Sequence, residues 1–122
     1  MRVEQNENRF LVVSFSPEER LCFSGALNEV CNGFQVADFE RQIGISREGA
    51  KQLHTELKKQ SSSDSPRIEL TVPQLAALRN ALTETLRELG IEEFETRVGI
   101  PFEDARKLER HIVHAIELLR TR

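Results

Sequence analysis

The sequence predicts an α+β protein, mainly helical, in which a unit of one strand and three helices occurs twice. Residues 12–58 align without gaps onto residues 67–113 at an offset of 55, with ten identical pairs. In both stretches a short strand-like segment precedes three helix-like segments that Gly residues separate. We therefore expect a single domain made of repeats 10–59 and 67–122, joined by the Ser-rich linker 60–66.

Each unit begins with one strand. Phe10–Phe15 is rich in β-branched apolar residues, and Arg67–Leu70 alternates apolar with charged residues. A strand without a partner is unstable alone, so the two units need each other. We expect their strands to pair as an antiparallel ribbon across an internal pseudo-two-fold axis, with the helices covering that ribbon.

Capping residues predict where the helices begin and end. Ser16 begins a capping box with Glu19, and Thr71 begins the equivalent box with Gln74. The first helices are expected to end at Gly33 and Gly90, and the short second helices, in left-handed conformation, at Gly44 and Gly99. The second helices are expected at Ala37–Ile43 and Glu92–Val98, and the third from about Arg47 to Lys59 and Phe102 to Leu119.

Two phenylalanines and two cysteines test how the predicted helices pack against the core. Phe39 and Phe94 are identical across the repeats and lie among polar residues on the short helices, so both are predicted to be core residues. Cys22 and Cys31 are nine residues apart on one predicted helix, too far apart to form a disulfide. We interpret Cys31 as a small core residue and Cys22 as incidental.

Composition restricts the classes of partner. The 17 basic and 20 acidic residues leave a net charge of −3, and neither half is a basic lobe. A mildly acidic chain suits a basic protein better than nucleic acid. No stretch approaches the length of a membrane span, and Met1–Arg9 lacks the apolar core of a signal peptide. We therefore expect a cytoplasmic protein with no membrane partner.

Catalytic and metal-binding motifs are missing from the sequence. It contains no Gly-rich phosphate loop, nucleophile elbow or Cys-x-x-Cys, so we predict no enzyme activity and no cofactor. His111 and His114 lie one helical turn apart, but Glu117 leans off that face, and no further ligand is specified. We interpret these three side chains as solvated rather than as a metal site.

A helix-turn-helix is the alternative interpretation. Phe39–Arg47 reads as a helix, a Gly turn and the start of a recognition helix. Phosphate contacts would then come from basic residues on the third helices, namely Lys51, Lys58, Lys59, Arg106, Lys107 and Arg110. Glu40 and Glu95 occupy a place where that motif favours a small buried residue, and the net charge argues against a polyanion.

Acidic residues gather near the start of both short helices. They are Asp38 and Glu40 in the first unit, and Glu92, Glu93 and Glu95 in the second. Part of this enrichment follows from the helix macrodipole, which favours acids at a helix N-terminus. The remainder predicts that these five residues bind a basic protein partner.

Two stretches of the first unit carry a resemblance. Ala26–Gly33 followed by Asp38–Glu48 is similar to small bacterial immunity-type proteins of polymorphic toxin systems, of the contact-dependent or Rhs-like kind. Glu93–Ile100 repeats the pattern in weaker form. The resemblance implies a protein that binds one cognate toxin tightly and has no catalysis. It carries over no individual functional residue and leaves open whether the chain forms a homodimer.

Overall fold

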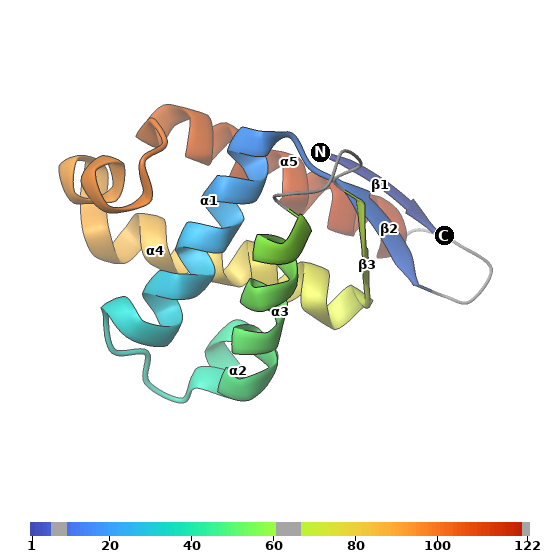
Figure 1. Cartoon of the computed structure of the whole chain (residues 1–122), viewed down its shortest axis with the longest axis horizontal. Helices are drawn as coiled ribbons and strands as arrows, with labels where there is room; N and C mark the ends of the chain where they lie inside the picture. Colours follow the sequence, from blue (N-terminus) through green and yellow to red (C-terminus); the bar gives the residue numbers. More distant parts are fainter. Residues whose placement is uncertain (6–9, 61–66, 121–122) are drawn as a thin grey trace.

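The protein is an α+β structure, mostly helical, with a three-stranded antiparallel sheet in the order β1-β2-β3 (Figure 1). The computed structural model describes residues 1–5, 10–60 and 67–120, so the predicted linker 60–66 lies outside the described residues except for Gln60. In chain order the elements are β1 (Arg2–Gln5), β2 (Leu11–Ser14), α1 (Pro17–Asn28), a π-helical turn η1 (Glu29–Gly33), α2 (Phe39–Ile43), α3 (Arg47–Gln60), β3 (Arg67–Leu70), α4 (Val72–Val98) and α5 (Phe102–Arg120).

The antiparallel pairing of β2 with β3 is confirmed. Val13 lies opposite Ile68, and Leu11 lies opposite Leu70. These four side chains are buried, as the alternation of a one-sided sheet requires. The expectation of a two-stranded ribbon is corrected by β1, which pairs antiparallel with β2 and places Val3 opposite Val13. Val3 is one apolar residue among polar neighbours, a pattern too short to predict a strand.

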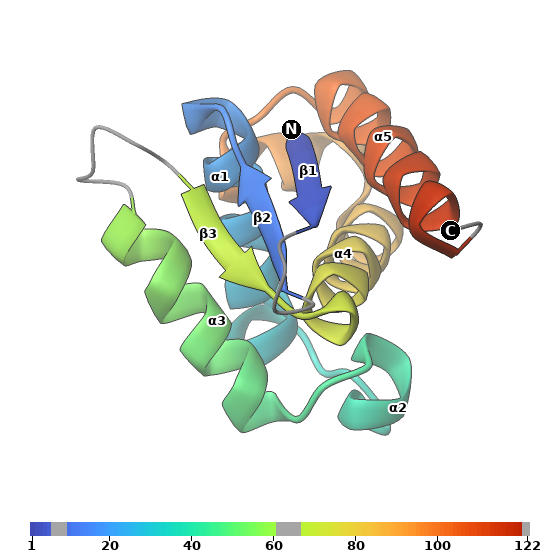
Figure 2. The ribbon, with the colours of Figure 1, turned by 90° about the vertical axis from the view of Figure 1, so that its right-hand side faces the viewer.

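The helices cover one face of the sheet. In Figure 2 the other face of the sheet points toward the viewer, α3 and α5 flank it, and α1 and α4 lie behind it. α1 packs against α4. Their approach is close at Gly25, where an added Cβ would lie 2.9 Å from Cγ1 of Val98. One hydrophobic cluster joins side chains of both halves of the chain.

The ends of the helices follow the capping chemistry of the sequence. Both predicted capping boxes are present, at Ser16 and at Thr71. Gly44 and Gly99 end α2 and α4 with φ of 104° and 84°. The predicted break at Gly90 is confirmed, because this residue has non-helical dihedral angles, with φ of 73° and ψ of −179°, and divides α4 into two helices that meet at a kink. The helix predicted at Glu92–Val98 is therefore the second of these two helices, the part of α4 beyond Gly90.

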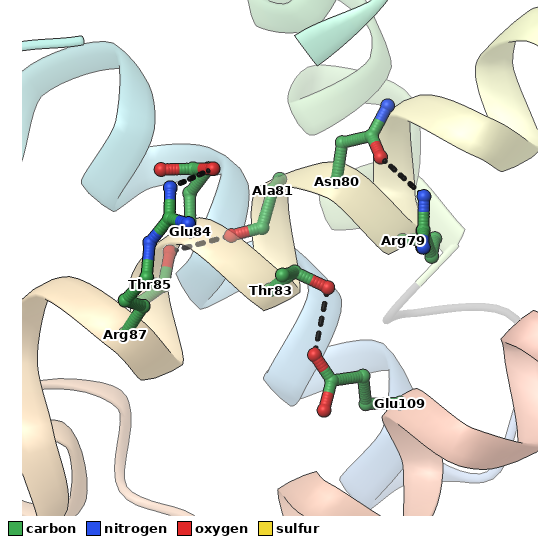
Figure 3. Close-up of polar contacts among 8 residues, drawn as sticks. All are labelled: Arg79, Asn80, Ala81, Thr83, Glu84, Thr85, Arg87 and Glu109. Carbon is green, nitrogen blue, oxygen red and sulfur yellow. Dashed lines mark hydrogen bonds and ion pairs between the residues drawn. The ribbon is translucent and has the colours of Figure 1, made fainter. Parts of the chain in front are cut away.

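Polar side chains of α4 connect it to its neighbours. Thr83 Oγ1 donates to Oε2 of Glu109 on α5 at 2.7 Å (Figure 3). Asn80 Nδ2 donates to the carbonyl of Ile43 at 2.8 Å and so holds the end of α2. The buried Thr85 hydroxyl is satisfied within α4 by the Ala81 carbonyl at 2.7 Å. Within the described ranges, none of the helices combines the length and apolar composition needed to cross a bilayer.

Candidate partner-binding site

The first acidic group lies on α2. Phe39 and Ile43 are buried and fix this short helix to the core, so Asp38 and Glu40 point to solvent. Asp38 adopts the left-handed conformation, with φ of 49° and ψ of 61°, and its side chain makes no capping bond. No ion pair joins Asp38 or Glu40 to another described residue.

The second acidic group lies beyond the kink of α4. Phe94 is fully buried, and Glu92, Glu93 and Glu95 surround it at exposed positions. Two of these acids have local contacts. Glu95 Oε2 accepts from the backbone N–H of Phe102 at 2.8 Å, and Glu93 Oε1 lies 3.6 Å from Nη1 of Arg97. Within the described parts of the chain, Glu92 has no ion pair or side-chain hydrogen bond.

The structure does not bring the two groups together. Figure 1 shows α2 at the bottom of the molecule and the last part of α4, in orange, at the upper left, and the two are also separate in Figure 2. Equivalent positions in the two halves therefore lie on two different parts of the surface. The five acids form two separate patches, the α2 patch (Asp38 and Glu40) and the α4 patch (Glu92, Glu93 and Glu95).

A buried carboxylate behind the α4 patch was not predicted. Glu29, at the start of η1, is only 5% exposed, and Oε1 of its carboxylate lies 2.8 Å from Nη2 of Arg97. No hydrogen bond of good geometry from the described residues reaches that oxygen, so the contact is mainly electrostatic. Gly33 makes room for the carboxylate, because a Cβ there would lie 2.1 Å from Oε1. Arg97 thereby links η1 to Glu93 of the α4 patch.

The structure corrects the interpretation of Cys22 as incidental, because Cys22 lies in the core, whereas Cys31 is only partly buried and packs against the core. Cys22 is 1% exposed, and burial together with the charge of Glu19 raises the pKa of its thiol to about 12. Cys31 is half-buried, and burial raises its pKa against the opposing effect of Arg47 and Lys51. The correction follows from the helical register, because Cys22 lies four residues before the buried Ala26 and so shares its face of α1. A nucleophilic role for Cys22 is disfavoured by its burial and raised pKa.

Most residues of the helix-turn-helix interpretation are exposed. One of them, Arg47, instead contacts other parts of the fold. Arg47 lies 4.5 Å from the centre of the Phe39 ring and donates from Nη1 to the Cys31 carbonyl at 2.8 Å. α2 contains only five residues. In the second half, the equivalent short helix is the part of α4 beyond the break at Gly90. In a helix-turn-helix the second helix enters the major groove, and here that helix begins at Arg47, whose guanidinium already contacts Phe39 and the Cys31 carbonyl.

The histidines of α5 are exposed and lie beside two shallow hollows. His111 borders both a hollow of about 260 Å³ near the start of α1 and one of about 180 Å³ beside Met1 and Val3. Across residues 1–5, 10–60 and 67–120, no three His, Cys, Asp or Glu side chains gather closely enough to hold a metal ion. A larger hollow, of about 400 Å³, lies between α3 and β3.

Comparisons of the chain with protein-family models, with curated proteins and with solved structures find no match.

Proposed function

We propose that this chain is a non-catalytic protein-binding module that neutralises a basic bacterial toxin in the cytoplasm, as an immunity protein does. The observation that carries the proposal is that three of the five predicted acids, Asp38, Glu40 and Glu92, are exposed and have no ion pair or side-chain hydrogen bond among the described residues. An acid that neither caps a helix nor pairs with a neighbouring base contributes little to folding. It remains available to a partner of opposite charge.

Electrostatic steering is the expected contribution of these acids. Charges of opposite sign on two proteins raise their association rate and have less effect on the dissociation rate. Toxin domains that act on nucleic acid approach phosphates and are therefore commonly basic. The net charge of −3 and the two acidic patches favour such a partner. Because the patches are separate, each is expected to act independently.

The test measures association with the toxin domain encoded by the adjacent gene. Glu40→Lys and Glu92→Lys should each slow association at low ionic strength, by about tenfold, and the difference should shrink as salt is added. Glu117→Lys changes the net charge equally on an exposed part of α5 outside both patches, so it is the matched control. Its association rate should stay much closer to that of the unchanged protein.

Two results would contradict the proposal. One is the absence of heat of binding in calorimetry at micromolar concentrations of both proteins. The other is tight binding to a DNA duplex, with affinity falling steeply as salt rises, which would favour the helix-turn-helix alternative.

We also propose that the two halves derive from a tandem duplication. The capping boxes at Ser16 and Thr71 are 55 residues apart, as are the left-handed Gly44 and Gly99 and the first residues of α3 and α5. Val13 and Ile68, which lie opposite each other in the sheet, are also equivalent at this offset. That register supports a pseudo-two-fold axis between them. An experimental structure in which residues 12–58 and 67–113 do not overlay element by element would contradict the duplication.

A further inference from the structure

The two equivalent strands, β2 and β3, have different neighbours on the sides that face away from each other. β1 covers the outer side of β2, whereas no strand among the described residues pairs with the outer side of β3. An open strand edge presents backbone N–H and C=O groups that can pair with another strand. A further strand at the outer edge of β3 would therefore continue the hydrogen-bonded ladder that β1, β2 and β3 already form.

The space beside β3 corresponds to the space that β1 occupies. If the chain is turned about the axis between Val13 and Ile68, β2 replaces β3 and α5 replaces α3. Figure 2 shows β1 between β2 and α5, and on the other side it shows α3 flanking β3. There the hollow of about 400 Å³ lies along Ile68, Glu69 and Leu70. Four lining residues are equivalent, at the offset of 55, to residues that line the hollow near the start of α1: Gln52 to Lys107, Leu53 to Leu108, Glu56 to His111, and Gln74 to Glu19.

The exposed charges of β3 complement the sequence of β1. In the sheet, Arg2, Val3 and Glu4 lie opposite Ser14, Val13 and Val12. The residues of β3 at the equivalent positions are Glu69, Ile68 and Arg67. A strand with the order of β1, placed in the same way on β3, would set its base against Glu69, its apolar residue against Ile68 and its acid against Arg67. Opposite charges at directly facing positions stabilise a strand pair.

Arg67 already attracts an acid on the outer face of the sheet. Its Nη2 lies 3.7 Å from Oε2 of Glu4, although β2 separates their two strands. Both Arg67 and Glu4 are largely exposed, so this ion pair is weak and a closer acid can replace it.

From these features we propose that the outer edge of β3 binds an extended segment of a partner protein by strand addition. The segment runs antiparallel to β3 and carries a basic, an apolar and an acidic residue in that order. The apolar side chain faces the hollow between α3 and β3. Because α3 flanks the edge, a single strand fits the site better than a second copy of the sheet. The assignment rests on the proposed role as a protein-binding module, but its test does not require the toxin.

The test uses a synthetic peptide with the sequence of Met1–Gln5, acetylated and amidated at its ends, as the probe. It is added at millimolar concentrations to the ¹⁵N-labelled full chain, and backbone amide shifts are followed. We expect saturable shifts at residues 67–70 and along the facing side of α3. A control peptide in which the Arg and Glu are exchanged should bind about fivefold more weakly, since two facing charge pairs become repulsive.

A reciprocal variant separates recognition from folding. Arg67→Glu combined with Glu69→Arg changes only exposed side chains and keeps the net charge. This variant should prefer the control peptide over the original peptide by a similar factor. An unchanged preference would overturn the proposed register.

Two further results would overturn the site itself. One is the absence of saturable shifts with both peptides. The other is a set of shifts confined to residues 2–5 and 11–14, which would mean that the peptide displaces β1 rather than adding to β3. Failure of the peptide to bind leaves the toxin proposal standing, and failure to bind the toxin leaves a positive peptide result standing.

Discussion

Phe94 anchors the last part of α4. It has no exposed surface, and its ring meets the Phe102 ring edge-on with 5.7 Å between centroids. Its equivalent Phe39 is 8% exposed, so the prediction that both are core residues is confirmed. We expect Phe94→Ala to lower the free energy of unfolding by about 3–5 kcal/mol, because it leaves a cavity that the helices cannot close. Urea denaturation measures this, and a loss below about 1 kcal/mol would show that the ring contributes little packing.

Gly33 lies against the buried Glu29 carboxylate, which leaves no room for a side chain at this position. Replacing it with Ala places a methyl group where the Glu29 carboxylate lies, and the carboxylate then moves away from Arg97. We expect Gly33→Ala to cost about 2–4 kcal/mol in the free energy of unfolding, by overpacking and by weakening the ion pair of the buried Glu29 carboxylate with the more exposed Arg97.

Gly49→Ala is the matched control for Gly33→Ala in the same denaturation experiment. Gly49 lies in the first turn of α3, where the nearest atom to an added Cβ is the Ser46 hydroxyl at 3.2 Å. A hydroxyl at the end of a small side chain can shift, and Ala favours helix over Gly, so this variant should change stability by less than about 1 kcal/mol. Equal effects at the two sites would contradict a special role for Gly33.

At the level of elements, the start of α1 is tied to the start of β1 through Glu19. Its Oε1 accepts from the Ser16 backbone N–H at 2.7 Å, and its Oε2 lies 2.6 Å from the Met1 ammonium group. Burial alone raises the pKa of Glu19, but these hydrogen bonds and the ammonium charge outweigh it and lower the pKa below its ordinary value. Folding therefore gains stability from Glu19 above its unfolded-state pKa. That gain is lost as the pH falls through the lower pKa of the folded state.

Glu19→Gln tests this dependence. Gln retains the capping box, as Gln74 does in the equivalent box of α4, but it cannot titrate. We expect the unchanged protein to be more stable than the variant near neutral pH. The difference should decline between about pH 5 and pH 3 in thermal melts, since carboxylates protonate there. A difference that stays constant over this range would show that Glu19 does not stabilise the fold through its charge.

The elements that the sequence predicted are those with local chemical signals. The capping boxes, the left-handed Gly44 and Gly99 and the bounds of α3 depend on residues within a few positions of each other. β1 could not be predicted, because its four residues form a strand only through pairing with β2. The burial of Glu29 depends on Arg97, which is distant in the sequence. The identity of Glu29 with Glu84 was visible, and both have an arginine partner, but only the Glu29 carboxylate is buried.

At the candidate site, too, features that depend on nearby residues were predictable, and features that depend on distant residues were not. Exposure of the five acids was predictable, because buried apolar neighbours such as Phe39 and Phe94 fix which side of each short helix faces solvent. Their separation into the α2 patch and the α4 patch depends on how the two halves pack, and no local pattern encodes that. The match between the edge of β3 and the sequence of β1 could not be inferred before the pairing of β1 with β2 was known.

At the level of the whole molecule, the two halves share one core. α1 packs on α4, and β2 pairs with β3. Neither half is expected to stay folded when the other unfolds, so unfolding should be one cooperative transition. The buried Cys22 thiol reports on the first half, and far-UV circular dichroism reports on all helices. In the Cys31→Ser variant, the urea dependence of Cys22 labelling and of circular dichroism should coincide, and two separated transitions would contradict a shared core.

The pairing of Val13 with Ile68 also has a consequence for the order of folding. The contact closes a loop of about 55 residues, and the entropy cost of closure must be met before any hydrogen bond between β2 and β3 forms. α1 and α3, by contrast, are near neighbours in sequence and can associate early. We therefore expect the central pair of strands to form late, after helical contacts have brought its two ends together. Until then both strands expose open edges, and in a crowded cell this is the interval in which the chain is most prone to pair with another copy of itself.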